Sequence, residues 1–254
     1  MNETTPNARA VLSFAMDLGK SMIQCGAEIS RVEESILRVC YAYGMEDTQV
    51  FSIISMIVAT TFDKGGKSET QSRRVYTYVT DFQKLEKLNA LSRRVFETRP
   101  PVEEAAEALR VIHEEKGGFH VTACLGYILA ASAFTVFFGG SWKDALCAAP
   151  IAVILYLVST LIKARGMNKL FVTALSSATS GFLALAFVHL GLADSAPMIM
   201  IGDIMLIIPG LMLINSLREM LCGDVMSGLL RLLESLIISA AIACGFAIPL
   251  LIFR

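Results

Sequence analysis

The feature that most limits how this 254-residue chain can fold is the uneven distribution of its charged residues. Positions 1–118 hold 32 of the 45 Asp, Glu, Lys and Arg residues, and the remaining 136 positions hold only 13. So long a stretch with so few charges provides several apolar windows of the roughly 20 residues that cross a bilayer. The sequence therefore predicts a soluble N-terminal domain, residues 1–116, followed by a membrane domain, residues 117–254.

The composition excludes several other classes of protein. The formal net charge is −1 and no basic block occurs, so no nucleic-acid partner is expected. The six cysteines form no CxxC pair, which is typical of small apolar filler residues, and we expect no metal and no cofactor. Residues 1–6 have neither the basic nor the apolar region of a signal peptide, so we expect the N-terminal domain to stay in the cytoplasm.

The N-terminal domain combines two kinds of periodicity. Apolar residues recur at helical spacing in four segments, at 11–26, 27–43, 82–97 and 102–115. Residues 49–62 and 69–80 are instead rich in β-branched side chains, and the Gly65-Gly66 pair between them is typical of a hairpin turn. We therefore predict an α+β domain with a small antiparallel sheet.

A charged group lies at the start of the second predicted helix. Its spacing predicts local ion pairs, Glu28 with Arg31 and Glu34 with Arg38, on a solvated helix face that also carries Glu33. The domain contains no convincing nucleophile–base set, phosphate-binding loop or metal motif. We therefore do not expect an enzyme.

Five windows of the membrane domain are apolar enough to be transmembrane helices. They lie near 119–140, 145–162, 170–192, 197–214 and 232–253. Lys and Arg are concentrated in the loops after the second and fourth windows, which places those loops and the N-terminal domain in the cytoplasm and the C-terminus outside. The predicted fold is thus an α-helical membrane protein, with five transmembrane helices preceded by a cytoplasmic α+β domain.

The fourth window is unusually polar. Asp203 lies inside it, where a charge is costly unless it is paired, protonated or hydrated. Pro209-Gly210 is expected to break the helix in its middle, and discontinuous helices recur at transporter binding sites. Alternatively, the span begins at Asp203 near the outer interface, and Pro209 only kinks it.

More polar residues follow the expected break. Asn215, Arg218 and Glu219 are spaced i, i+3, i+4 and so share one helix face. An arginine here could pair with a substrate carboxylate, and a buried carboxyl could carry a coupling proton. Alternatively, Arg218 and Glu219 are ordinary loop charges, and Glu234 is an interfacial residue. The candidate substrate- or ion-binding residues are Asp203, Pro209, Gly210, Asn215, Arg218, Glu219, Asp224, Arg231 and Glu234.

Two segments resemble the threonine/serine exporter family of membrane proteins. One is Gly26-Ala27-Glu28 followed by Arg31-Val32-Glu33. The other contains Pro209-Gly210, Asn215, Arg218-Glu219, Gly223-Asp224, Gly228 and Arg231. Glu219 stands where the family pattern has Asp, which keeps the charge and lengthens the side chain. The predicted order of a cytoplasmic domain and then five spans also resembles the family.

The resemblance implies export of threonine, serine or another small carboxylate such as succinate across a bacterial inner membrane. It also implies the split form of the family, similar to the larger component of a two-component succinate exporter. Its partner would be a separate multi-span membrane protein of about 150 residues, in a hetero- and homo-oligomer. The sequence has no ATP-binding loop, so we expect coupling to an ion or substrate gradient. The alternatives are a non-transporting assembly or regulatory subunit, and a membrane-tethered enzyme with a hydrolase-like cytoplasmic domain.

Overall fold

The computed structural model describes residues 7–62, 65–76, 79–115, 121–165 and 168–253. The chain divides into two compact units. The N-terminal unit comprises Met1–Lys116 and Ile214–Arg231, and the helical unit comprises Gly117–Leu213 and Leu232–Arg254. The N-terminal unit therefore includes a segment that is distant from it in the sequence.

The N-terminal unit contains the predicted combination of helices and strands. Its first elements are helices α1 and α2 and strands β1, β2 and β3, which span Ala8–Gln24, Ile29–Ala42, Glu46–Ile53, Met56–Phe62 and Ser68–Arg74. Helices α3 and α4, Phe82–Thr98 and Val102–Glu114, follow. The strands pair antiparallel in the order β1-β2-β3. All four helices lie where the apolar periodicity predicted them.

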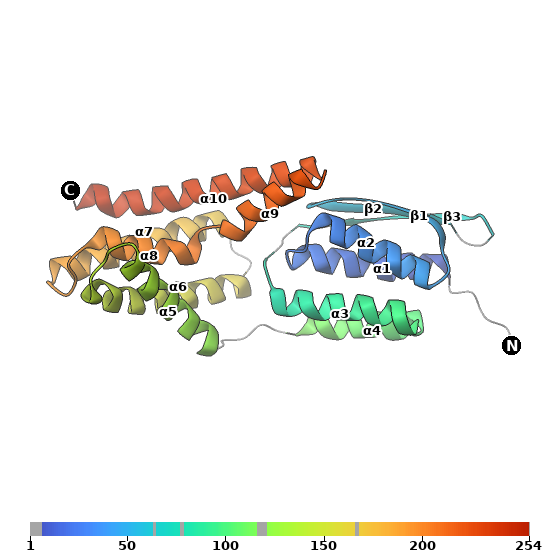
Figure 1. The fold of residues 1–254 in the computed structure, drawn as a ribbon, viewed down its shortest axis with the longest axis horizontal. Coiled ribbons are helices and arrows are strands. Elements are labelled where there is room, and N and C mark those ends of the chain that lie inside the picture. The colour runs from blue at the N-terminus through green and yellow to red at the C-terminus, as the bar shows by residue number, and fades with distance from the viewer. Residues whose placement is uncertain (1–6, 63–64, 77–78, 116–120, 166–167, 254) are drawn as a thin grey trace. The chain divides into compact units, whose positions relative to one another are not determined.

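These elements form three layers, as Figure 1 shows for the sheet, the α1–α2 pair and the α3–α4 pair. Helix α1 packs against the sheet, α2, α3 and α4, and so lies in the middle. This position explains why α1 buries apolar residues around most of its circumference, among them Leu12, Met16, Leu18 and Ile23. The core of the unit thus lies on both sides of α1 and α2.

The third strand is shorter than the sequence predicted. A strand was expected over residues 69–80, but β3 ends at Arg74. The chain leaves the sheet because the backbone N–H groups of Val79 and Asp81 donate to the carbonyls of Gln24 and Cys25, at the end of α1. Part of the predicted hairpin turn, at Lys64, lies outside the described residues.

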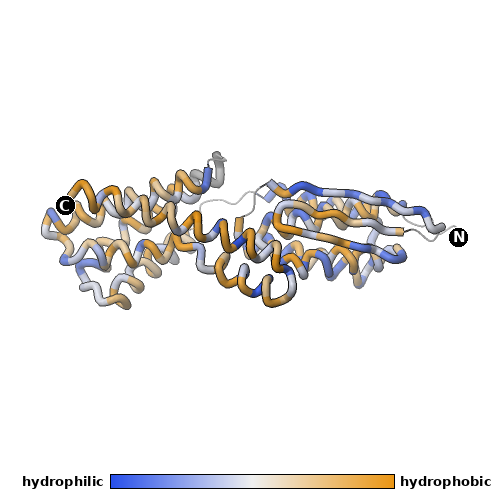
Figure 2. The backbone as a smooth tube through the Cα atoms, turned by 90° about the horizontal axis from the view of Figure 1, so that it is seen from above, coloured by the Kyte–Doolittle hydropathy of each residue, from blue (hydrophilic) through white to orange (hydrophobic). Residues whose placement is uncertain are grey.

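The remaining helices are strongly apolar, as the hydropathy colours of Figure 2 show. They are α5 to α10, and they span Val121–Phe137, Trp142–Arg165, Lys169–His189, Ala196–Ile207, Gly210–Leu221 and Val225–Ile252. Among the described residues, α6, α7 and α10 are long and apolar enough to cross a membrane. Helices α8 and α9 together qualify as one broken span with a bend of 49°, and α5 is a shorter apolar helix. The protein is therefore a membrane protein with three to four candidate spans, and the count of five stays a prediction.

Helix α8 lies at the centre of the helical unit, in contact with α5, α6 and α7. Small residues allow the close approach of the helices. Gly202 of α8 faces Ala131 and Thr135 of α5, and Gly245 of α10 faces Ala174 of α7. Side chains on α8 are consequently held in a tightly packed environment.

We expect Gly202→Ala to destabilise the protein by about 1–3 kcal/mol, the usual range for overpacking. An added Cβ would lie 2.7 Å from the carbonyl oxygen of Ala131 and would also collide with Thr135. Gly126→Ala on α5 is the matched control, because a Cβ there meets no atom within 4 Å. Thermal unfolding of the two purified variants in detergent tests the packing. Equal stability of the two variants would contradict the close α5–α8 contact.

Candidate functional site

Parts of the two segments that carry the family resemblance come together in the N-terminal unit. The start of α2 contacts the hairpin made by the end of α9 and the start of α10. Nη1 of Arg218 donates to Oε1 of Glu28 over 2.6 Å, between residues 190 positions apart in the sequence. Nη2 of Arg231 donates to the carbonyl oxygen of Ala27 over 2.9 Å. We refer to Ala27, Glu28, Arg218, Glu219 and Arg231 as the α2–hairpin junction.

The sequence explains locally why the hairpin is tight. Gly223 has a φ of 100°, a left-handed conformation that glycine adopts without strain. The N–H of Asp224 donates to the carbonyl of Glu219 over 2.9 Å and closes the turn. At Gly228, an added Cβ would lie 2.6 Å from the carbonyl oxygen of Ser216. The two helices therefore approach each other at a position where only glycine fits.

A buried ion pair connects the two arms of the hairpin. Nε of Arg231 lies 3.0 Å from Oε2 of Glu219, and each side chain is only 3% exposed. The Glu219 carboxylate also lies near the backbone N–H of Ile29, the first residue of α2. A carboxylate is favoured there because a helix N-terminus carries partial positive charge. Glu219 and Arg231 thus anchor the hairpin to the start of α2.

The other ion pair of the junction is open to solvent. Arg218 is 58% exposed and Glu28 is 22% exposed. The predicted pair of Glu28 with Arg31 is not formed, because the Glu28 side chain is directed to Arg218. The predicted pair of Glu34 with Arg38 is confirmed. Sequence spacing therefore identified the local pair and missed the distant one.

Carboxylates outnumber guanidinium groups around the junction. Glu33 accepts a hydrogen bond from the backbone N–H of Ser52 over 2.6 Å. Partial burial, together with the nearby charge of Asp224, raises the pKa of Glu33 above its ordinary value of 4.5. Asp224 also faces the charge of Glu219. The described residues thus place the carboxylates of Glu28, Glu33, Glu219 and Asp224 around two arginines.

The raised pKa of Glu33 predicts a pH-dependent stability. A folded-state pKa above the unfolded value gives stability that is complete below about pH 4.5 and is lost as the pH rises through the raised value. Glu33→Gln keeps an acceptor for the Ser52 N–H but removes this loss. We expect the melting temperature of Glu33→Gln, relative to wild type, to increase from pH 4.5 to pH 7. Glu34→Gln on the exposed face of α2 is the control, and the same pH trend in both variants would contradict the prediction.

A second polar site lies in the helical unit. Asp203 is 0% exposed, and its Oδ2 accepts a hydrogen bond from Oγ of Ser180 over 2.6 Å. Its Oδ1 accepts no hydrogen bond from any described residue. Helix α8 begins at Ala196, so Asp203 lies within the helix and not at its start. A carboxyl in this position is a candidate ion- or proton-binding group.

The helix breaks where the sequence predicted. Helix α8 ends at Ile207 and α9 begins at Gly210. Pro209 has no N–H, so the carbonyl of Met205 cannot receive the usual i+4 hydrogen bond. The break therefore leaves a backbone acceptor two residues beyond Asp203, as occurs in discontinuous transporter helices.

The other predicted site residues lie apart from one another. Asn215 is partly buried in α9, one turn before Arg218, and its side chain makes no hydrogen bond or ion pair with a described residue. Glu234 lies in the helical unit, where its carboxylate is 3.9 Å from the ammonium group of Lys169. The junction thus contains Arg218, Glu219 and Arg231 with Asp224 beside them. Asp203 and Glu234 belong to the helical unit.

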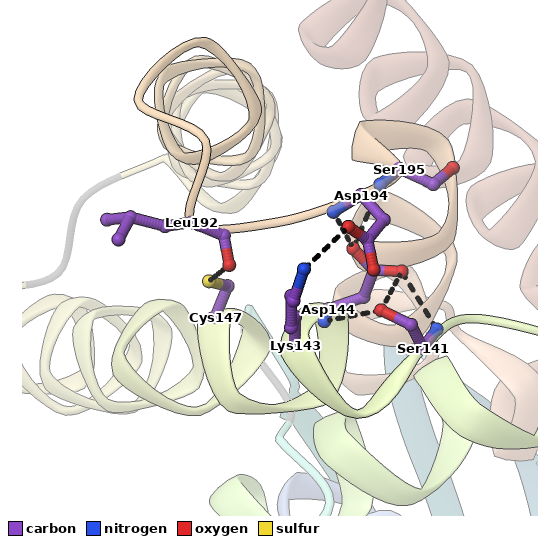
Figure 3. Close-up of polar contacts among 7 residues, drawn as sticks. All are labelled: Ser141, Lys143, Asp144, Cys147, Leu192, Asp194 and Ser195. Carbon is purple, nitrogen blue, oxygen red and sulfur yellow. Dashed lines mark hydrogen bonds and ion pairs between the residues drawn. The ribbon is translucent and has the colours of Figure 1, made fainter.

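Asp144 was not among the residues predicted from the sequence, and it organises one end of the helical unit (Figure 3). Its Oδ1 accepts the N–H groups of Asp194 and Ser195 over 2.8 and 2.9 Å, and its Oδ2 accepts the N–H of Ser141 over 2.8 Å. The spacing Ser141-x-x-Asp144 at the start of α6 is a capping-box pattern and could have identified the residue. Asp144 joins the start of α6 to the loop before α8, and so helps to hold the helix that carries Asp203.

A comparison with known protein families decides the affiliation of the chain. The threonine/serine exporter (ThrE) family matches residues 13–253, nearly the whole length. The chain belongs to the threonine/serine exporter family. The family resemblance inferred from the two motif segments is therefore confirmed, and membership supports an exporter role.

Two curated bacterial relatives carry matching names. The "Threonine/serine exporter" of Corynebacterium glutamicum is 25% identical over 248 residues, 92% of this chain and 50% of that protein. The "Probable threonine/serine exporter" of Mycobacterium tuberculosis is 24% identical over 246 residues, 96% of this chain and 46% of that protein. This chain thus spans about half the length of these relatives. No solved structure matches it significantly.

Proposed function

We propose that this chain is a subunit of a secondary exporter that carries small carboxylates, such as threonine, serine or succinate, out of the bacterial cytoplasm. The observation that carries the proposal is a broken apolar helix with a fully buried carboxyl close to the break, in a chain of an exporter family. Discontinuous helices expose backbone groups that can bind ions and substrates inside a membrane. An intramembrane carboxyl is a common proton carrier in transporters.

Asp203 is the coupling group in this proposal. One oxygen of its carboxyl accepts a hydrogen bond from Ser180, and the other accepts none from the described residues. The second oxygen is therefore available to take up and release a proton. Ser180 is the residue that orients the carboxyl. Glu234 is the second acidic residue of the helical unit that we assign to coupling, through its partner Lys169.

Arg218 is the carboxylate-binding residue in this proposal, and Arg231 has a structural role. The distinction rests on burial. The Arg231 side chain is enclosed with Glu219 and the Ala27 carbonyl, whereas Arg218 is exposed to solvent. Guanidinium groups bind carboxylates through paired hydrogen bonds, which an accessible arginine can offer to a solute.

A second membrane protein completes the exporter in this proposal. The named relatives are about twice as long as the region that this chain matches. We propose that a separate multi-span protein of about 150 residues works with this chain in a hetero-oligomer. Export should therefore require both proteins.

The proposed export direction requires a defined topology. We expect a reporter fused at Asn2 or within residues 166–168 to be cytoplasmic, and one fused after Arg254 to be external, because Lys and Arg are concentrated in cytoplasmic loops. Paired fusions to alkaline phosphatase and green fluorescent protein measure the two locations. Both ends on one side of the membrane would rule out five spans.

The central test replaces the buried carboxyl. We expect Asp203→Asn to abolish efflux of preloaded labelled threonine or succinate while membrane abundance stays near wild type, because an amide cannot carry a proton. The control is Asp194→Asn, an exposed Asp of the same unit, which should export normally. Cells must also make the proposed partner. Wild-type efflux from Asp203→Asn would refute the coupling role, and efflux by the partner alone would identify this chain as an assembly subunit.

A further inference from the structure

We propose that Glu28 occupies the place of a substrate carboxylate on Arg218, so that Arg218 is an entry site for small carboxylates from which Glu28 must first withdraw. The inference rests on the proposed export function, which it deepens by naming a competing group within the chain. It follows from a comparison of the two ion pairs of the α2–hairpin junction.

The two ion pairs differ in how easily their charges can separate. The Glu219–Arg231 pair is 3% exposed on both sides, so separating its charges would leave two opposite charges apart in a buried place, which is costly. The Glu28–Arg218 pair is 22% and 58% exposed, so water can solvate both groups when they part. Ion pairs that reach solvent contribute little net stability. Glu28 can therefore leave Arg218 at little cost in stability.

The start of α2 does not depend on a capping bond from the Glu28 side chain. Glu28 is the N-cap residue of α2, with an extended backbone at φ −71° and ψ 142°. Its side chain makes no capping hydrogen bond to the helix. The carboxylate of Glu219 lies near the Ile29 N–H instead, so α2 keeps an anion at its N-terminus when Glu28 moves.

Neighbouring charges weaken the hold of Arg218 on Glu28. Glu28 lies within electrostatic range of Glu219, which also faces Asp224. The like charge of Glu219 repels Glu28, and the ion pair with Arg218 attracts it. Exchange of Glu28 for a solute carboxylate keeps the charge on Arg218 balanced and allows Glu28 to move away from its acidic neighbours into solvent.

The ligand class follows from the chemistry of Arg218. The Glu28 contact uses one N–O pair, Nη1 to Oε1. A guanidinium group has five N–H donors and binds a free carboxylate through two parallel hydrogen bonds. A small unattached carboxylate can adopt that geometry without the constraint of the α2 backbone. The site therefore takes small solutes that carry an accessible carboxylate.

Binding to the purified full-length chain tests the exchange directly. Threonine and succinate are titrated separately, and the rise in melting temperature is recorded. We expect Glu28→Gln to lower the half-saturating concentration by up to about fivefold, the range of an exposed ion pair. The matched control is Glu34→Gln, which breaks the exposed pair with Arg38. Unchanged half-saturation in Glu28→Gln, or no thermal response in either protein, would overturn the proposal.

A charge reversal separates exchange from a purely structural latch. Glu28→Arg and Arg218→Glu are each expected to lower the melting temperature, and the double variant should recover it because the pair is restored with opposite signs. The double variant should still fail to bind threonine or succinate and fail to export, because position 218 then carries a carboxylate. Full recovery of binding by the double variant would show that the pair only holds the hairpin.

The export function and the exchange at Arg218 can be refuted separately. Absence of efflux from cells that make the wild-type chain and its partner would refute the export function but would leave the binding result intact. Normal wild-type efflux with unchanged binding in Glu28→Gln would refute the exchange alone.

Discussion

The buried ion pair between Glu219 and Arg231 is the interaction that keeps a distant part of the sequence within the N-terminal unit. It holds a hairpin from late in the sequence against the start of α2. Two buried charges are costly to desolvate, and removing one partner of such a pair typically costs about 3–5 kcal/mol. The pair is therefore a poor source of stability but a strong determinant of position. An apolar substitute would pack as well without fixing which residues of the hairpin meet α2.

Burial gives different roles to two arginines that lie on the same hairpin. Arg231 is enclosed and already bound to a carboxylate and a backbone carbonyl, so it has little to offer a solute. Arg218 reaches solvent and makes a single carboxylate contact. The sequence motif marks both arginines in the same way. Only their surroundings in the structure distinguish Arg231, which has a structural role, from Arg218, the proposed binding residue. The same reasoning separates Asp203, which is enclosed near the helix break, from the exposed Asp194.

Local features of the fold could be predicted from the sequence, and distant contacts could not. Helical periodicity located α1 to α4, and Pro209 located the break in the fourth apolar window, because both depend on neighbouring residues. The pairing of Glu28 with Arg218 joins positions 190 residues apart, which no periodicity encodes. The early end of β3 likewise depends on contacts with the end of α1. Asp144 is an intermediate case, since its cap is local but its hold on the loop before α8 is not.

Helix α9 carries Arg218 beyond the break. Gly210 begins α9 beside Pro209, and Arg218 lies eight residues further on, about 12 Å along the axis. The next residue, Glu219, is fixed by the buried pair with Arg231, which itself binds the carbonyl of Ala27 at the start of α2. Arg218 is therefore held in place by its neighbour, and the proposed exchange needs only the Glu28 side chain to move.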